Sequence, residues 1–198
     1  MSKGLKNPDR NERARAVRAL GGSQDRAGAV HALEAVLRHD PDRRVRIYAA
    51  DSLGHLGGPE ATALLVEKAA STDESVVRTA ALTVIETIRD PSAIPGLINL
   101  FRLNRGDDDV KAQFGASQAL LNMRTPGVPQ LLQALNDPSA KVRGAVVEVL
   151  GRMGAAGWAT PEVADRITSL QADPDPGVQQ AVAVALATLK GKPEPKMP

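Results

Sequence analysis

One stretch of the sequence decides the fold: Asp40-Pro41-Asp42-Arg43-Arg44-Val45-Arg46-Ile47-Tyr48-Ala49-Ala50-Asp51-Ser52-Leu53-Gly54-His55-Leu56-Gly57. Its apolar residues recur at steps of three and four, which places them in one stripe along a helix. An Asp directly before Pro predicts the helix N-terminus, because the carboxylate caps free N–H groups while Pro fits the first turn. Gly57 and Gly58 predict the end of the helix.

This stretch recurs along the chain in one register. Six polar residues open the units: Asn7, Asp40, Thr72, Asp107, Asp137 and Asp173. Six residues later comes a set that we call the Arg/Gln row: Arg13, Arg46, Arg78, Gln113, Arg143 and Gln179. Seven residues further stand Leu20, Leu53, Ile85, Leu120, Leu150 and Leu186. Six polar openers and six apolar residues in one register indicate an internal repeat.

A second set of apolar stripes lies between these helices, as in residues 29–37, 93–101 and 128–135. No segment shows the alternation of a β-strand. Because a unit of two helices cannot bury its apolar face alone, neighbouring units must stack. The sequence therefore predicts an all-α fold, an α-solenoid (superhelix) of about six two-helix repeats. We expect a single solenoid over residues 1–190 and a disordered tail over residues 191–198.

The stretch from Asp40 to Gly57 resembles the HEAT repeat, and in particular the short HEAT-like repeats named after phycobilisome lyases. Residues 137–154 match the pattern nearly as well, and the resemblance covers roughly residues 7–190. There are departures: Gln113 and Gln179 replace the usual Arg, and the fourth repeat has a longer predicted loop over residues 104–109. The resemblance implies a fold and little about function.

Composition limits the kinds of chemistry available. The sequence has no cysteine, so disulfides and thiolate metal sites are excluded. No apolar run reaches the length of a membrane span, and we expect a cytoplasmic protein that does not enter membranes. Residues 1–46 hold eleven Lys and Arg against six Asp and Glu, a net charge of +5. This basic end is interpreted as a polar capping repeat or as a site for nucleic acid.

Motifs of enzymes are not found. The three histidines, His31, His39 and His55, lack the further ligands of a metal site, and none is followed by Glu as in the HEAT-like deoxyhypusine hydroxylases. The chain contains no phosphate-binding loop and no nucleophile elbow. The sequence therefore favours a protein that is not an enzyme and holds neither a metal nor a cofactor.

In HEAT-type folds the second helix of each repeat lines the concave face. Positions one, two, five and nine after the Arg/Gln row are then expected to point outward. The predicted groove comprises Arg15, Arg18, Ile47, Tyr48, Asp51, His55, Thr79, Thr83, Thr87, Phe114, Gln118, Asn122, Glu148 and Arg152. For Tyr48 and Phe114 the alternative of an inward, core-filling role stays open.

The favoured function is a non-catalytic scaffold, a monomer whose concave groove binds a peptide or helix of another protein. One alternative is nucleic-acid binding through the basic N-terminal repeats. A second alternative, drawn from the resemblance, is a bilin lyase-like subunit that handles a chromophore. The Arg/Gln row is itself expected to be structural: Arg46, Arg78 and Arg143 should reach carbonyls or the carboxylates of Asp40, Asp73, Asp137 and Asp173, since Arg can bond a carboxylate through two N–H groups.

Overall fold

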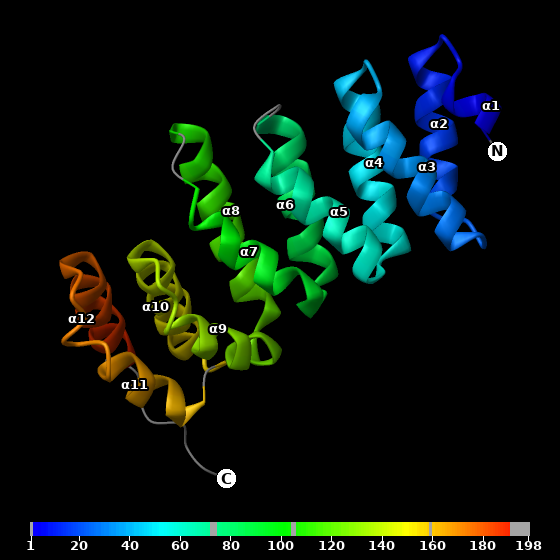
Figure 1. The fold of residues 1–198 in the computed structure, drawn as a ribbon. Helices are drawn as coiled ribbons and strands as arrows, with labels where there is room; N and C mark the ends of the chain where they lie inside the picture. The colour runs from blue at the N-terminus through cyan, green and yellow to red at the C-terminus, as the bar shows by residue number, and fades with distance from the viewer. Residues whose placement is uncertain (1, 72–74, 104–105, 159, 191–198) are drawn as a thin grey trace.

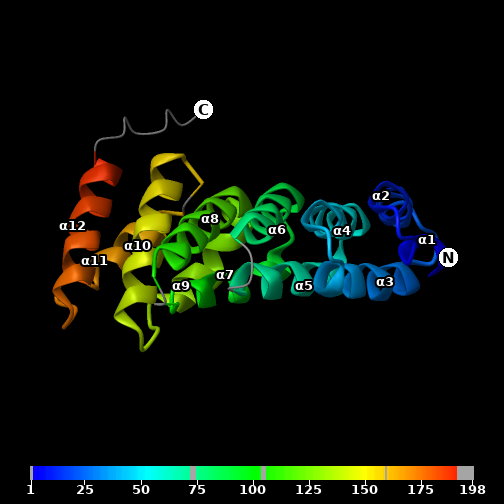
Figure 2. The same cartoon turned by 90° about the horizontal axis from the view of Figure 1, so that it is seen from above.

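The computed structural model describes residues 2–71, 75–103, 106–158 and 160–190. Within these ranges every regular element is helical, and the helices form two layers that run the length of the molecule (Figures 1 and 2). The first layer holds α1 (Ser2–Leu5), α3 (Arg26–His39), α5 (Gly58–Ala70), α7 (Ile94–Leu100), α9 (Val128–Ala134) and α11 (Pro161–Thr168). The second layer holds α2 (Arg10–Leu20), α4 (Arg43–Leu56), α6 (Ser75–Ile88), α8 (Asp107–Met123), α10 (Ala140–Ala155) and α12 (Pro176–Lys190). The 3-10 turns η1 (Pro91–Ala93) and η2 (Thr125–Gly127) precede α7 and α9.

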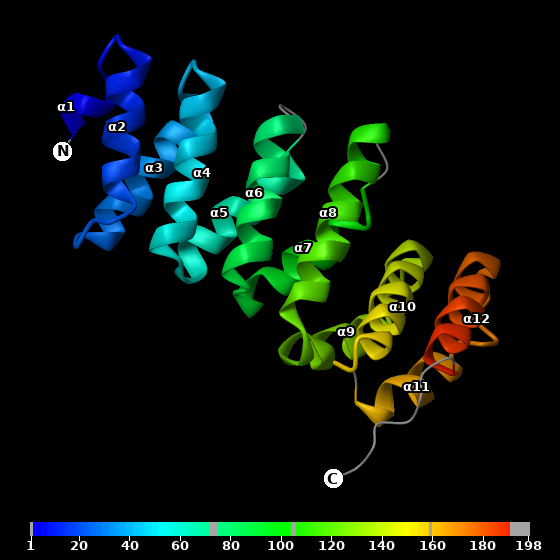
Figure 3. The ribbon, with the colours of Figure 1, turned by 180° about the vertical axis from the view of Figure 1, so that it is seen from behind.

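The order of helices confirms the predicted α-solenoid of six two-helix units. Consecutive units stack side by side from α1 to α12, as Figure 3 shows from behind. Between the layers each inner unit buries one large aliphatic residue from its second helix: Leu53, Ile85, Leu120 and Leu150, all at 0% exposure. The first layer contributes Leu33, Leu65, Leu97 and Leu131, which are equally buried. The core is therefore the repeated stripe that the sequence predicts.

The repeat openers do not cap the helices as predicted. Asp40, Asp137 and Asp173 each accept a hydrogen bond from the backbone N–H two residues later, at 2.9, 2.8 and 3.0 Å. These bonds fold the Asp-Pro step into a turn that precedes the helix. The cap comes two residues later, as when Asp42 accepts from the N–H of Arg44 at 2.8 Å. The predicted start was thus two residues early, because the opener's carboxylate serves its own turn.

The predicted loop over residues 104–109 is wrong in its second half. Asp107, Asp108 and Asp109 form the first turn of α8, where carboxylates are favourable beside the positive end of the helix dipole. Residues 104 and 105 lie outside the described residues, as do Thr72, Asp73 and the predicted tail over 191–198.

Arg13 and Arg143 bind the opener of the following repeat. Arg13 Nε and Nη2 lie 2.8 and 3.0 Å from the two carboxylate oxygens of Asp40. Arg143 Nε and Nη2 hold Asp173 in the same way, at 2.8 and 2.7 Å. Arg143 Nη1 also donates to the carbonyl of Asp137 at 2.8 Å. The predicted contacts of Arg143 with carbonyls and with Asp173 are therefore confirmed.

The other members of the Arg/Gln row differ in their hydrogen-bond and ion-pair partners. Arg46 donates to the carbonyl oxygen of Asp40, and Gln113 donates to that of Leu103 at 2.7 Å. Arg78 reaches the next repeat as predicted, but at Asp108, which was not among the candidate acceptors: Nη2 lies 3.6 Å from Oδ2, and Nη1 lies 3.5 Å from the carbonyl oxygen. At the fourth repeat Gln113 cannot form an ion pair, and the carboxylate of Asp137 is bound instead by Arg102, which follows α7. The contact between the fourth and fifth repeats is therefore made by a residue that follows a first-layer helix.

Because of the Arg143–Asp173 ion pair, the stability of the fold should depend on pH in the acid range. Its hydrogen bonds lower the pKa of Asp173 below the ordinary value, against the opposing effect of desolvation. A carboxyl group whose pKa is lowered by folding stabilises the fold above its unfolded pKa, about 3.9, and loses this contribution as the pH falls through the folded value. We therefore expect the melting-temperature difference between the wild type and Asp173→Asn to be constant near neutral pH and to shrink below about pH 4. Thermal melts monitored by circular dichroism across this range measure it, and a difference that grows in acid would contradict it.

Adjacent helices of the second layer contact one another more extensively than do adjacent helices of the first layer. Two glycines permit this approach: a Cβ built on Gly54 would lie 2.3 Å from Val84 Cγ1, and one on Gly151 would lie 2.7 Å from Ala185 Cβ. The junction between α8 and α10 is an exception, since these two helices share far fewer contacts.

Candidate functional site

The second layer carries all the predicted groove residues. They lie on α2, α4, α6, α8 and α10, and each is exposed or half-buried. The exposed members are Arg15, Arg18, Asp51, His55, Thr79, Thr83, Thr87, Phe114, Glu148 and Arg152; the half-buried ones are Ile47, Tyr48, Gln118 and Asn122. Counting from the Arg/Gln row therefore identifies one continuous face of the solenoid. We call this face the second-layer groove.

An aromatic and basic corner occupies its N-terminal part. The guanidinium carbon of Arg18 lies 3.8 Å from the centre of the Tyr48 ring, in a cation–π contact that joins α2 to α4. Tyr48 and Ile47 also pack against the core, so their outer edges alone face the groove. His55 Nδ1 lies 2.9 Å from the carbonyl oxygen of Asp51 and 3.8 Å from its carboxylate.

Most of the polar side chains in the middle of the groove have partners within the protein. Thr79, Thr83 and Thr87 donate their hydroxyls to backbone carbonyls one turn earlier, at 2.8, 3.0 and 2.8 Å. Asn122 Nδ2 donates to Glu86 at 2.7 Å, which links α8 to α6. Arg152 Nη2 donates to Gln118 at 3.0 Å, which links α10 to α8. Since these groups are held, the middle of the groove offers few free donors and a fixed shape.

The structure adds an apolar cluster to the groove. Phe114 is 62% exposed, so it does not turn inward, and Val110, one turn earlier on α8, is 63% exposed. Val76 on the neighbouring α6 is 45% exposed. We refer to Val76, Val110 and Phe114, which are exposed on the neighbouring helices α6 and α8, as the apolar cluster. Val76 and Val110 were missed because the counting ran forward from the Arg/Gln row, and they stand two residues before Arg78 and three before Gln113.

A cavity of about 440 Å³ extends the groove between α10 and α12. Glu148 and Arg152 line one side of it, and Gln180, Val184 and Thr188 line the other. Val184, at 58% exposure, lies five positions after Gln179 and was therefore within reach of the same counting.

Four basic side chains of the N-terminal repeats have acidic partners. Arg10 pairs with Asp42 and Arg13 with Asp40. Arg15 pairs with Glu12, and Arg38 with Glu34 and Glu67. In the described ranges no three His, Asp or Glu side chains converge as metal ligands would, and no helix there is both long and apolar enough to cross a bilayer.

The fold has relatives among solved structures. The TOG3 domain of Mini spindles from Drosophila melanogaster superimposes with a TM-score of 0.54 at 13% identity, over 98% of this chain and 94% of that one. A TOG-domain array of microtubule polymerases, described for tubulin recruitment and assembly, gives 0.53 at 15% identity, over 95% and 45%. The complex of CpcE and CpcF of phycocyanin lyase from Nostoc sp. PCC7120 is 24% identical, with a TM-score of 0.49 over 94% and 74%.

Comparison of the sequence with known proteins and family models identifies the family of the chain. Serine/threonine-protein kinase 36 from Pongo abelii is 31% identical over 113 residues, which is 50% of this chain, and the chain spans 9% of that protein's length. The model of the HEAT repeats matches residues 1–86, 32–117 and 128–196. Because these matches cover most of the chain and coincide with the stacked helix pairs, the protein belongs to the HEAT-repeat family.

Proposed function

We propose that the protein is a non-catalytic scaffold that binds a peptide or helix of another protein in the second-layer groove. One observation carries this proposal. The large apolar side chains that the described part of the chain exposes are Val76, Val110, Phe114 and Val184, and all of them lie on second-layer helices. Exposed apolar side chains gathered on one face are typical of protein-binding surfaces.

The fixed polar groups around the apolar cluster support the same proposal. A partner that covers Phe114 need not immobilise Asn122 or Gln118, because both are already held by hydrogen bonds to neighbouring helices. Binding therefore loses less side-chain entropy than it would on a loose surface. The tubulin of the TOG-domain structure is not transferred to this chain, since that likeness is one of fold.

The test begins by identifying the partner. A photo-crosslinking amino acid at position 114, introduced in the native host, should capture a protein that the same probe at the exposed Gln130 on α9 does not. Phe114→Ala should then weaken binding of the purified partner by roughly tenfold to thirtyfold, as expected for an aromatic anchor. Calorimetric titration measures the affinity, and Gln130→Ala is the matched control.

Stability separates a binding role from a structural one. Because Phe114 is largely exposed, Phe114→Ala should change the free energy of unfolding by no more than about 0.5 kcal/mol. Tyr48→Ala together with Asp51→Ala should also weaken binding. Unchanged affinity in both variants, with a loss in Gln130→Ala, would move the site to the first layer.

A further inference from the structure

Two adjoining cavities lie at the C-terminal end of the second-layer groove. The first holds about 370 Å³ and is lined mainly by residues of α10 and α12. The second is the cavity of about 440 Å³ between the same two helices. Glu148, Gly177 and Ala181 line both of them. Because they share these residues, we name the two cavities together the α10–α12 hollow.

Gly144, which lines the hollow, is not required by the packing of the helices. A Cβ built on Gly54 or Gly115 would lie 2.3 or 2.7 Å from a side chain of the neighbouring helix, so those positions need glycine. At Gly144 the built Cβ would meet only Val178 Cγ2, at the ordinary contact distance of 3.9 Å. The residue lies inside α10, and its φ is not positive. Since glycine weakens a helix relative to alanine, a glycine without a packing reason points to a use for the space above it.

Glu148 supplies the free charge of the hollow. Its side chain is exposed and has neither a hydrogen bond nor an ion pair within the described part of the chain. The other charged side chains of the lining are engaged. Arg152 donates to Gln118, Asp175 accepts from backbone N–H groups at the start of α12, and Lys141 also has an interaction partner.

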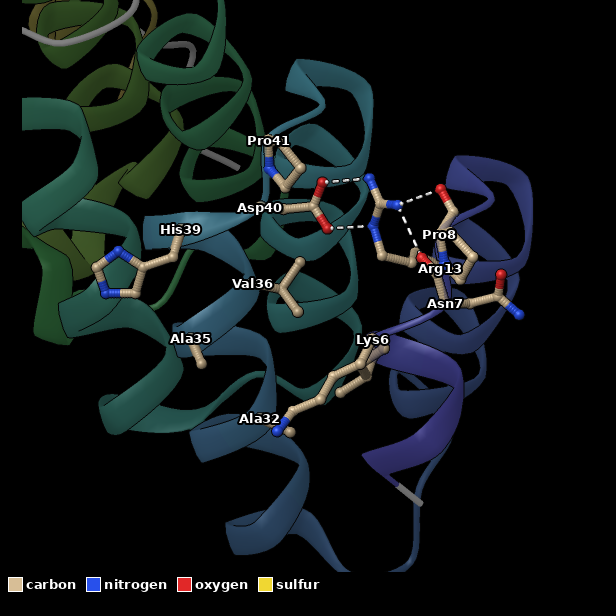
Figure 4. A pocket seen from close by; sticks show the side chains of 11 residues that line it. Lys6, Asn7, Pro8, Arg13, Ala32, Ala35, Val36, His39, Asp40 and Pro41 are labelled. Atoms are coloured by element: carbon tan, nitrogen blue, oxygen red, sulfur yellow. Dashed lines mark hydrogen bonds and ion pairs between the residues drawn. The ribbon is translucent and has the colours of Figure 1, made fainter.

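A carboxylate that serves the fold is paired differently. Figure 4 shows Asp40, both of whose oxygens meet nitrogens of Arg13, at 2.8 and 3.0 Å. Glu148 has no such cation, because Arg152, one turn later on α10, is turned toward α8 by its hydrogen bond to Gln118. The α10–α12 hollow therefore offers its carboxylate to a cation from outside the chain.

The hollow and the apolar cluster are neighbours on the groove. Gln113 lines the hollow, and Phe114 is the next residue of α8. One bound segment can therefore place an apolar side chain on Phe114 and a cationic side chain beside Glu148.

We infer that the α10–α12 hollow receives an arginine side chain from the protein segment that binds the second-layer groove, an inference that rests on the proposed function and names the chemistry of the partner. A guanidinium group donates two N–H groups to one carboxylate, here that of Glu148, whereas the ammonium of lysine acts as a point charge. The apolar stem of the arginine lies over Gly144, where no side chain stands in its way. An apolar residue beside the arginine covers Val184, which is 58% exposed.

The test compares two pentapeptides blocked at both ends. One is Gly-Leu-Arg-Leu-Gly, and the other carries citrulline, which keeps the shape of arginine without its charge. Titration into the isotope-labelled protein, followed by NMR, measures weak binding and locates it. At low salt the arginine peptide should bind roughly fivefold or more tightly than the citrulline peptide, with the largest shifts on α10 and α12. Glu148→Gln should abolish this preference, whereas Glu60→Gln, the same change at an exposed site on α5, should preserve it.

Substitution of Gly144 tests the open space. Gly144→Leu places a side chain in the hollow and should weaken the arginine peptide roughly tenfold, while circular dichroism shows the helical fold retained. The smaller Gly144→Ala should weaken the peptide less and raise the melting temperature, so that stability and binding change in opposite directions.

Several outcomes would overturn this inference: equal affinity for the two peptides, shifts that map outside α10 and α12, or unchanged binding in Glu148→Gln or Gly144→Leu. A concentration-dependent dimer that Glu148→Gln abolishes would overturn it as well, since an arginine of a second copy would then fill the hollow. Phe114→Ala should leave pentapeptide binding unchanged. Capture of a partner at position 114 without pentapeptide binding would reject this inference alone, and pentapeptide binding without capture would reject the proposed function alone.

Discussion

Replacing Arg143 by Ala should lower the free energy of unfolding by roughly 2–4 kcal/mol, since it leaves a buried carboxylate without its cation. Asp173 is 6% exposed, and both of its oxygens are held by Arg143. The same change also frees the carbonyl of Asp137, which accepts from Arg143 Nη1. Urea denaturation followed by circular dichroism measures the loss, and Arg152→Ala, an exposed site on the same helix, should cost less than about 1 kcal/mol.

The double variant separates the lost ion pair from lost packing. Gln occupies the Arg/Gln row naturally at positions 113 and 179, where it donates to a carbonyl. Arg143→Gln should therefore keep the bond to the Asp137 carbonyl but leave Asp173 charged and unpaired. Adding Asp173→Asn removes that charge and should restore more than half of the loss. A double variant as unstable as Arg143→Gln alone would show that the charge of Asp173 is unimportant.

Two glycines on α10 should respond to alanine in opposite directions. A Cβ on Gly151 would lie 2.7 Å from the Cβ and 3.1 Å from the backbone Cα of Ala185, so α12 must move away. We expect Gly151→Ala to destabilise the protein by about 1–3 kcal/mol. A Cβ on Gly144 would meet only Val178 Cγ2, at 3.9 Å, and Gly144→Ala should stabilise by up to about 1 kcal/mol, because alanine loses less entropy in a helix.

The pair controls for helix propensity, since both positions lie inside one helix that faces α12. Thermal melts should place Gly144→Ala above the wild type and Gly151→Ala below it. Equal shifts of the same sign would mean that propensity, rather than the close contact of α10 and α12, determines the response.

The fold was predictable because it rests on spacing. A stripe such as Val45, Ala49 and Leu53 needs only helical periodicity to become a core, and six copies in register require stacking. The bond from Arg143 to Asp173 was also accessible, since both recur at fixed places in each unit. The bond from Arg102 to Asp137 was not, because it joins residues that share no position in the repeat and meet only through the stacking of α7 near the fifth opener.

The sequence predicted which face of the helices forms the second-layer groove, but not the hydrogen bonds of the side chains on it. Counting from the Arg/Gln row identified the outward face of α8, including Phe114. The counting could not show that the hydroxyls of Thr79 and Thr83 donate to backbone carbonyls of their own helix. Serine and threonine can form such local hydrogen bonds in any helix, and the sequence does not indicate where they do.

The sparse contact between α8 and α10 has a mechanical consequence. Elsewhere in the second layer neighbouring helices contact one another more extensively, whereas here the Gln118–Arg152 hydrogen bond links two helices that otherwise touch little. Figure 2 shows α10 and α12 lengthwise in a view that looks nearly along α4, so the solenoid also twists toward this end. Arg102 holds the same junction on the first-layer side. Because fewer contacts between α8 and α10 resist rotation there, we expect a change in the curvature of the solenoid to concentrate between its fourth and fifth repeats.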